Sequence, residues 1–282
     1  MFKARFGNKF VVNWHHQLLC NEIEDLVWGR SVSNVGTPGP TELLVINMPP
    51  RYTKTEICVV NFVPWVLTFN PAAKFIHSSF SDDLVNHNSS QAREILDHEA
   101  YAGLWDVNIA PDTDSKSLWM TEQGGGLYVA PARGTITGFG AGVTHHGAYG
   151  RNFGGGILID DPLKPDDARS DVIRGAVNER LLTTFISRRN SRETPIILIM
   201  QRLHEDDMTG FILNGNTGLR VRHVKLPALQ KDGTALWPYK HTAEELLNMQ
   251  NAEPYVFSGQ MQQDPSPPQG RYFKNEWVQY YE

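Results

Sequence analysis

Short, continuous runs of apolar residues recur along the chain, and polar residues follow each run directly. The clearest runs cover residues 43–46, 157–159 and 196–200. An apolar run of this length without alternation is typical of a strand that is covered on both faces, as in a parallel sheet. Further strands are expected at residues 74–79, 127–137 and 219–226. The pattern therefore predicts an α/β fold with a mostly parallel central sheet flanked by helices.

Apolar residues at helical spacing fill most of the segments between these runs. Helices are expected at residues 10–30, 55–69, 82–98, 171–189, 242–250 and 254–263. Pro64 should kink the second of these helices or end it early, because proline has no N–H to donate to the preceding turn. Ser81, Asp82 and Asp83 match a helix N-cap with an acidic first turn, and we prefer that interpretation to a metal site. The polar segment 108–126 is expected to be irregular.

The composition narrows the class of protein. The chain has 282 residues, 40% of them apolar and 20% charged, which is enough for the core of one large α/β domain or two small ones. A net charge of −5 does not suggest a free-standing nucleic-acid binder with a basic surface. Cys20 and Cys58 stand far apart and in no metal-ligand spacing, and no apolar run reaches the roughly 20 residues of a membrane span. We expect a soluble intracellular protein that does not enter a membrane.

One strand-to-helix connection carries the first chemical signal. The apolar run 43–46 ends at Pro49-Pro50, and Lys54-Thr55 follows ahead of a helical segment. A phosphate-binding loop has this order, in which backbone N–H groups and the lysine hold phosphate and the neighbouring hydroxyl binds magnesium. The general pattern has glycine where this chain has Met48 and Thr53. The alternative is an ordinary strand-to-helix turn with a surface lysine. When no ligand is bound, we expect the Lys54 side chain to be solvated.

Thr53 raises a question about the path of this loop. The residue before the lysine turns its N–H toward phosphate, and glycine does so without steric cost, whereas a β-branched residue at positive φ is strained. Either Thr53 is strained and weakens nucleotide binding, or Pro49-Pro50 give the loop a different path. We favour the different path.

Two consecutive carboxylates carry the second signal. Asp160 and Asp161 come directly after the apolar run 157–159. The carboxyl ends of parallel strands are where α/β proteins bind ligands. There the first acid can hold magnesium, and the second can orient and deprotonate an attacking water. A solvated turn ending at Pro162 is the weaker interpretation, because Asp160 stands at the strand end itself.

Together these features resemble the large subunit of tailed-bacteriophage terminases, the ATP-driven motors that package DNA. The matching segments are MPPRYTKTE (48–56), ILIDDPLK (157–164), IILIMQRLHEDD (196–207) and FSGQMQQDP (257–265). They occur in the order of the family, and the likeness extends from about residue 12 to residue 280. The resemblance implies a P-loop ATPase fold of the additional-strand type, with ATP and Mg²⁺ as cofactors.

The resemblance also implies roles for individual residues. Lys54 and Thr55 would bind phosphate and magnesium, Asp160 would bind magnesium, and Asp161 would be the catalytic carboxylate. Arg51 resembles the loop arginine that contacts the γ-phosphate in the family.

Other positions are implied by their place in the motifs. Gln201 would sense the γ-phosphate and couple nucleotide state to motion, although the family usually has Thr or Ser there. An arginine from a neighbour in a ring is also expected, and Arg133 and Arg151 are candidates by position. The remaining loop residues expected beside the nucleotide are Pro50, Tyr52, Thr53 and Glu56.

A domain organisation and partners follow from the same resemblance. Residues 1–263 would form the ATPase domain, with a helix and loop at 10–40 ahead of the phosphate loop. Residues 264–282 would be a linker toward a nuclease domain that the chain does not contain. The implied partners are double-stranded DNA, the portal protein, the terminase small subunit and further copies of the chain in a homo-oligomeric ring on the procapsid, in the host cytoplasm.

Two alternatives stay open. Asp160, Asp161, Asp166 and Asp167 could form the two-metal site of a nuclease, although a nuclease does not need Lys-Thr after a strand and turn. The chain could also be a nucleotide-binding assembly module with little hydrolysis, which Thr53 in place of glycine would allow.

Overall fold

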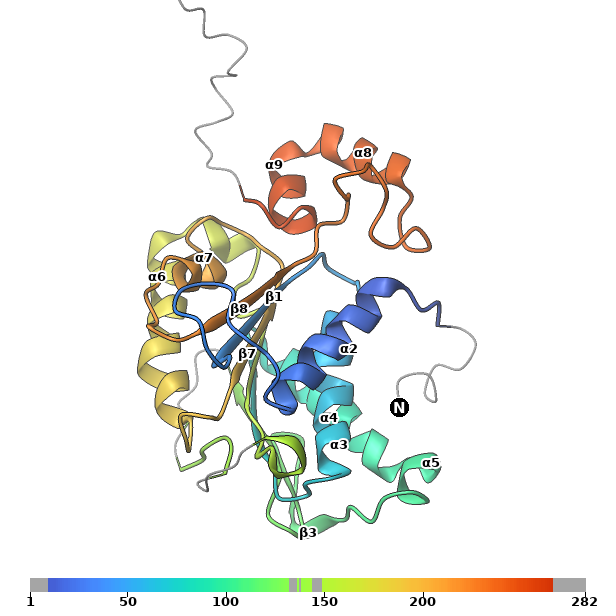
Figure 1. The fold of residues 1–282 in the computed structure, drawn as a ribbon, viewed down its shortest axis with the longest axis vertical. Coiled ribbons are helices and arrows are strands. Elements are labelled where there is room, and N and C mark those ends of the chain that lie inside the picture. The colour runs from blue at the N-terminus through green and yellow to red at the C-terminus, as the bar shows by residue number, and fades with distance from the viewer. Residues whose placement is uncertain (1–9, 132–135, 137, 144–148, 266–282) are drawn as a thin grey trace, which may run out of the picture.

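Eight strands form one sheet with helices on both faces (Figure 1). The computed structural model describes residues 10–131, 136, 138–143 and 149–265. The strand order is β3-β4-β5-β2-β6-β7-β1-β8, and every pair from β5 to β8 is parallel, whereas β3 and β4 are antiparallel to their neighbours. The strands are β1 (Leu43–Asn47), β2 (Lys74–Ser79), β3 (Ile109–Asp114), β4 (Leu118–Thr121), β5 (Gly126–Pro131), β6 (Ile157–Asp160), β7 (Ile196–Met200) and β8 (Val221–Lys225). The predicted α/β class with a mostly parallel sheet is confirmed.

The three central strands β1, β6 and β7 are buried over their whole length, as their apolar sequences predict. β7 lies between the other two, and Ile199 pairs with Ile46 on one side and with Asp160 on the other. The loop after β1 and the carboxylates at the end of β6 therefore lie at the same end of the sheet, where the parallel strands have their carboxyl ends. One additional strand, β7, lies between β1 and β6. This is the arrangement expected of an additional-strand P-loop fold.

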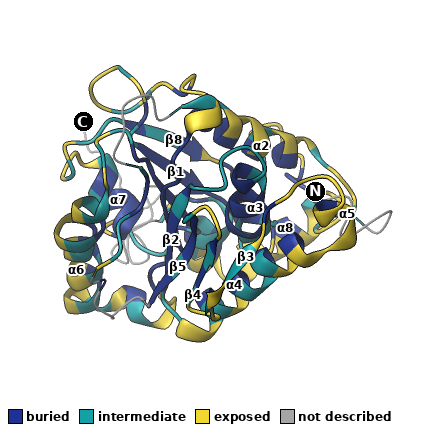
Figure 2. Ribbon diagram, turned by 90° about the horizontal axis from the view of Figure 1, so that it is seen from below, coloured by how far each residue is buried: buried dark blue, intermediate teal, exposed yellow. Residues whose placement is uncertain are grey.

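Alternate residues of the central strands face two separate cores. Leu44 and Ile46 belong to the core under α2, α3 and α4, whereas Leu43 and Val45 belong to the core under α6 and α7. The sheet is thus buried between helices whose outer faces are exposed (Figure 2). The helices are α2 (Trp14–Val27), α3 (Phe62–Leu67), α4 (Asp82–Asp97), α5 (Glu99–Ala102), α6 (Asp171–Arg180), α7 (Met208–Leu213), α8 (Ala243–Ala252) and α9 (Pro254–Val256), with π-helical turns η2 (Glu56–Asn61), η5 (Leu181–Phe185) and η7 (Phe257–Met261) and 3-10 turns η3 (Gly150–Asn152), η4 (Asp166–Arg169) and η6 (Ile186–Arg188).

The helix after the phosphate loop does not end at Pro64, so of the two expected effects, a kink or an early end, the early end is wrong. The chain runs through η2 into α3, which continues to Leu67. Pro64 is the third residue of α3, and because it has no N–H, a carbonyl in the preceding turn loses its helical donor. The Asn61 side chain donates to Glu56 O over 2.7 Å within the preceding π turn. The change from a π-helical to an α-helical turn falls just before the proline.

The segment 108–126, expected to be irregular, contains the edge strand β3 and its neighbour β4. Trp119 and Thr121 of β4 are fully buried, and the Trp119 Nε1–H donates to Ser89 Oγ of α4 over 3.1 Å. β3 is the edge strand of the sheet, and its polar residues do not show the apolar pattern expected of a strand. Charged residues on an edge strand discourage pairing with other chains. By contrast, the predicted cap of α4 is confirmed, because the Ser81 side chain accepts from Leu84 N.

The chain after β8 forms a small lobe with its own core beyond the end of the sheet (Figure 1). We call residues 228–263 the C-terminal lobe. Leu246 of α8 and Phe257 of η7 are buried there with Ala228 and Ala235. A search of the described residues finds no helix with the length and apolar character needed to cross a membrane.

The approach of β2 to β6 depends on a glycine, and this generates a stability prediction. Gly155 has φ +106°, and a Cβ there would lie 2.1 Å from Lys74 O. We expect Gly155→Ala to lower the free energy of unfolding by about 3 kcal/mol or more, because overpacking adds to backbone strain.

Gly175 in α6 provides a matched control. It is exposed, and a Cβ there would meet no atom within 4 Å. Gly175→Ala should therefore raise the free energy of unfolding by about 0.5–1 kcal/mol, as alanine is the better helix former. Urea unfolding followed by circular dichroism measures both variants, and a small loss for Gly155→Ala would contradict the close β2–β6 approach.

Candidate functional site

The polar residues that follow β1 and β6 contact one another at the end of the sheet. Lys54 Nζ lies 2.9 Å from Asp161 Oδ2. Thr55 Oγ1 donates a hydrogen bond of 2.7 Å to Asp160 Oδ2. Residues more than 100 positions apart in the sequence thus form two adjacent pairs, as the strand-end argument predicts.

The loop between β1 and η2 is held down by its own apolar residues. Met48 and Tyr52 are completely buried, and helical structure begins at Lys54. The first N–H groups of a helix have no intrahelical partner and favour an anion. Lys54 is only 5% exposed, so the expectation of a solvated lysine is wrong: the ion pair with Asp161 draws its side chain inward.

Burial and like charge act together on the two carboxylates. Burial first, and the neighbouring Asp161 carboxylate second, raise the pKa of Asp160 to about 7, against the opposing effects of Lys54 and Thr55. Burial alone would lower the pKa of Lys54, but Asp161 and Asp160 outweigh it and leave that pKa raised. Lys54 is therefore charged at neutral pH, and the site favours an additional cation beside Asp160.

The donor set at Asp160 fits magnesium. Asp160 is fully buried, and its Oδ1 has no hydrogen-bond partner within the described residues. The Thr55 hydroxyl and this carboxylate are the hard oxygen ligands that Mg²⁺ prefers. The described part of the chain contains no cluster of three or more His, Cys, Asp or Glu residues that could hold a metal. A metal here would take only one or two protein ligands, as Mg²⁺ does when water and phosphate supply the others.

Asp161 is fixed through both of its carboxylate oxygens. Oδ2 faces Lys54, and Oδ1 accepts from Gln201 N over 3.2 Å. Its backbone is left-handed, with φ 42°. Gln201 follows β7, and its Oε1 is buried with no hydrogen-bond partner among the described residues. The structure thus brings the predicted Gln201 beside the predicted catalytic carboxylate.

The loop contains two further left-handed residues, Arg51 with φ 65° and Thr53 with φ 69°. The preferred expectation that Pro49-Pro50 would spare Thr53 from positive φ is therefore wrong. Thr53 adopts the conformation that glycine would adopt freely, and its hydroxyl donates to Tyr52 O over 2.6 Å. Arg51 is exposed, and Pro50 is partly buried.

Glu56 is the predicted loop residue that turns away from the carboxylates. Its side chain accepts from Asn61 Nδ2 over 3.1 Å, within η2. Arg151 lies in η3, ahead of β6 and therefore at the opposite edge of the sheet from Asp160. Arg133 lies outside the described residues.

A cluster of aromatic rings adjoins the loop and was missed from the sequence. Tyr52 Oη lies 3.0 Å from His241 Nδ1, and the Trp237 ring stands 4.8 Å from His16 and 5.4 Å from His15, centroid to centroid. Burial lowers the pKa of His15 to about 3 and of His16 to about 4, so both rings are neutral.

Three nitrogens of this cluster, His15 Nε2, His16 Nε2 and Trp237 Nε1, are buried without a hydrogen-bond partner in the described structure. The apolar spacing of residues 10–30 predicts a helix there but does not indicate this cluster. Spacing could not indicate the cluster, because Trp237 and His241 come from the C-terminal lobe.

Two solved structures are similar to the chain in fold. One is the crystal structure of the HK97 bacteriophage large terminase, with a TM-score of 0.49 and 13% identity over 87% of this chain and 55% of that chain. The other is the crystal structure of the DUF1998 helicase MrfA, with a TM-score of 0.47 and 15% identity over 80% of this chain and 32% of that chain. The chain thus spans about half of the terminase and a third of the helicase. No protein-family model and no curated protein matches the sequence.

The left-handed Thr53 generates a prediction. Strain of this kind costs on the order of 1–3 kcal/mol, and Thr53→Gly removes it at the expense of unfolded-state entropy. We expect Thr53→Gly to raise the free energy of unfolding by about 1 kcal/mol. Thr53→Ala is the control, since alanine remains strained at positive φ. Urea unfolding measures both variants, and a lower free energy of unfolding in Thr53→Gly would contradict the strain.

Proposed function

We propose that the protein hydrolyses Mg-ATP as the motor ATPase domain of a terminase-like large subunit and so drives double-stranded DNA into a procapsid. The observation that carries the ATPase assignment is the pairing of Lys54 with Asp161 and of Thr55 with Asp160. A lysine and a hydroxyl at the start of a helix, facing two carboxylates from a strand two positions away in the sheet, are the groups that Mg-nucleotide chemistry requires.

Each residue of the site has a separate role in this proposal. Lys54 would leave Asp161 to bind the terminal phosphates, and the N–H groups around it would hold phosphate oxygens. Thr55 and Asp160 would hold Mg²⁺, which when bound neutralises the charge on the phosphate oxygens. Asp161 would orient the attacking water and accept its proton. The exposed Arg51 is free to turn toward the γ-phosphate, and Gln201 would report its presence through Asp161.

The aromatic cluster supports a place for the base. His15, His16 and Trp237 place three buried nitrogens, which have no hydrogen-bond partner among the described residues, in the ring cluster beside Tyr52 of the phosphate loop. A purine base has both hydrogen-bond donors and acceptors on its edge, and aromatic faces stack on it. Under this proposal, the C-terminal lobe and the start of α2 enclose the nucleotide together.

The larger assembly is proposed from the sequence resemblance. The partners would be DNA, the portal protein, the small subunit and further copies of the chain in a ring, in the host cytoplasm. A neighbour in the ring would supply an arginine to the site, for which Arg133 and Arg151 remain candidates, so the isolated chain should be a slow ATPase. Residues 1–263 would form the ATPase domain, with 264–282 as the linker; most of that linker lies outside the described residues.

The contacts favour this function over a two-metal nuclease. Asp160 and Asp161 contact Thr55 and Lys54, whereas Asp166 and Asp167 lie apart in η4. A two-metal site would need carboxylates that coordinate two metal ions about 4 Å apart. The assembly module with little hydrolysis is compatible with the strain at Thr53, and turnover measurements distinguish it.

Single-turnover hydrolysis of radiolabelled ATP, with enzyme in excess, tests the proposal. We expect Asp161→Asn to bind Mg-ATP at least as tightly as the unchanged chain, because Lys54 is released, and to hydrolyse it roughly 10²–10⁴-fold more slowly. Asp160→Asn should instead raise the Mg²⁺ concentration needed for half-maximal turnover. Lys54→Met should abolish both binding and turnover. Identical behaviour of the two asparagine variants would contradict the division of roles.

Asp166→Asn is the matched control, since it removes the same charge from an exposed residue of η4. It should retain the full rate of ATP hydrolysis. DNA incubated with the chain and Mg²⁺ or Mn²⁺ should stay intact. Cleavage that disappears in both Asp160→Asn and Asp166→Asn would favour the nuclease instead.

A further inference from the structure

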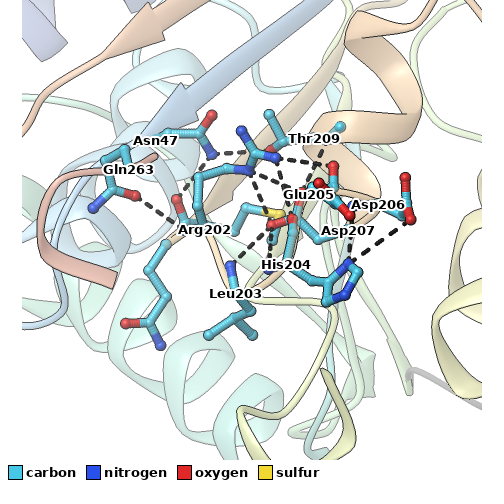
Figure 3. A network of polar contacts seen from close by, with 12 residues as sticks. Asn47, Arg202, Leu203, His204, Glu205, Asp206, Asp207, Thr209 and Gln263 are labelled. Carbon is cyan, nitrogen blue, oxygen red and sulfur yellow. Dashed lines mark hydrogen bonds and ion pairs between the residues drawn. The ribbon is translucent and has the colours of Figure 1, made fainter. Parts of the chain in front are cut away.

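One glutamine joins the C-terminal lobe to the end of β7 (Figure 3). Gln263 Oε1 accepts from Arg202 N over 3.0 Å, and Gln263 Nε2 donates to Gln260 O within the lobe. The residue is 1% exposed and left-handed, with φ 56°. An unfavourable backbone conformation persists only where its surroundings over-determine it. The end of the lobe thus holds this amide against the backbone of the turn that follows β7.

The amide just before Arg202 bonds the proposed catalytic carboxylate. Gln201 N donates to Asp161 Oδ1, and the next N–H along the chain donates to Gln263. A single peptide link connects the two donors. A shift of Gln263 would therefore act on the donor that fixes Asp161 through a single residue, and without that donor the carboxylate would keep its contact with Lys54.

The other side of this turn is rigid. Arg202 Nε lies 2.9 and 3.0 Å from the two oxygens of Asp207, which is fully buried. Asp207 also accepts from Leu203 N and from Gly210 N at the start of α7. Figure 3 shows these bonds converging on the Arg202–Asp207 pair. The turn after β7 is thus anchored to α7 independently of the lobe.

Apolar packing does not fill the space between the lobe and the loop after β6. A cavity of about 350 Å³ lies there, lined by Asp166 and Arg169 on one side and by Tyr255 and Val256 on the other, with Leu203 at the turn. Beside this cavity the lobe meets the turn through Gln263 and through Gly259, where an added Cβ would lie 3.1 Å from Arg202 O. The bond from Gln263 is the side-chain contact that places the Arg202 amide.

On the premise of the proposed ATPase, we infer that Gln263 is a positioning residue. It holds the Arg202 amide so that Gln201 N keeps the Asp161 carboxylate in its orientation. Activation of the attacking water then depends on the position of the C-terminal lobe. The neighbouring Gln262 offers a built-in comparison. Its Oε1 accepts from Leu229 N and its Nε2 donates to Leu229 O, so both bonds stay inside the lobe.

The test compares Gln263→Leu with Gln262→Leu, since leucine has a similar size and makes no hydrogen bond. With the full chain in excess over radiolabelled Mg-ATP, Gln263→Leu should lower the single-turnover rate roughly 10- to 100-fold, as small misplacements of a reacting group do. Its dissociation constant for Mg-ATP should change less than about threefold. Gln262→Leu should lower the thermal midpoint but keep the rate within about threefold. Equal rates for the two variants would overturn the inference.

Gln263→Glu adds a readout that a merely structural role would not move. A protonated carboxyl can accept from Arg202 N and donate to Gln260 O, as the amide does, whereas an ionised one cannot donate. Burial raises the pKa of such a carboxyl. The rate of Gln263→Glu relative to the unchanged chain should therefore rise as the pH falls from about 8 to 6. A flat ratio would overturn the inference.

Failure of the proposed function is a distinguishable result. If the unchanged chain hydrolyses no ATP, the ATPase proposal fails, and hydrogen exchange tests the linkage by itself. Gln263→Leu should then speed exchange of the Gln201 and Arg202 amides at least tenfold, and Gln262→Leu should leave them unchanged. Unchanged exchange in Gln263→Leu would overturn the linkage as well.

Discussion

The rest of the site depends on a buried lysine ammonium beside one buried and one partly buried carboxylate at the carboxyl ends of the strands. Taking such charges out of water is expensive, and replacing a buried ion pair with apolar residues is often neutral or stabilising. Stability alone therefore gives a weak reason for Lys54, Asp160 and Asp161 to be there. Asp160 has one carboxylate oxygen without a hydrogen-bond partner among the described residues, and the pKa of this carboxyl group is raised to about 7. A bound cation would complete such an arrangement and gives it a chemical reason.

The strand ends around this cluster are joined by polar side chains. Asn47, the last residue of β1, donates through Nδ2 to Met200 O of β7 and to Thr209 Oγ1 of α7, and its Oδ1 lies 2.8 Å from His223 Nε2 of β8. The phosphate loop begins at the next residue. The phosphate loop, the carboxylates and the C-terminal lobe are thus all positioned by hydrogen bonds to Met200 at the end of β7 or to the two residues after it. Asn47, Asp161 and Gln263 make these bonds.

Much of this could be predicted from sequence, for identifiable reasons. The continuous apolar runs made β1, β6 and β7 recognisable, and the polar residues directly after them predicted which groups meet. The edge strand β3 and its neighbour β4 were missed because their segment lacks a continuous apolar run, and the expected early end at Pro64 was wrong because the chain stays helical to Leu67. The burial of Lys54, the positive φ of Thr53 and the contribution of Trp237 and Gln263 depend on tertiary contacts that no local pattern encodes.

The most direct test of the account is whether metal and nucleotide bind at this site as one unit. Mn²⁺ can replace Mg²⁺ as a paramagnetic probe, and electron paramagnetic resonance counts the free ion during a titration. The account predicts that the chain binds Mn²⁺ tightly with a non-hydrolysable ATP analogue present and at least tenfold more weakly without it, and that Thr55→Val abolishes this difference. Tight Mn²⁺ binding that is indifferent to the nucleotide would contradict it.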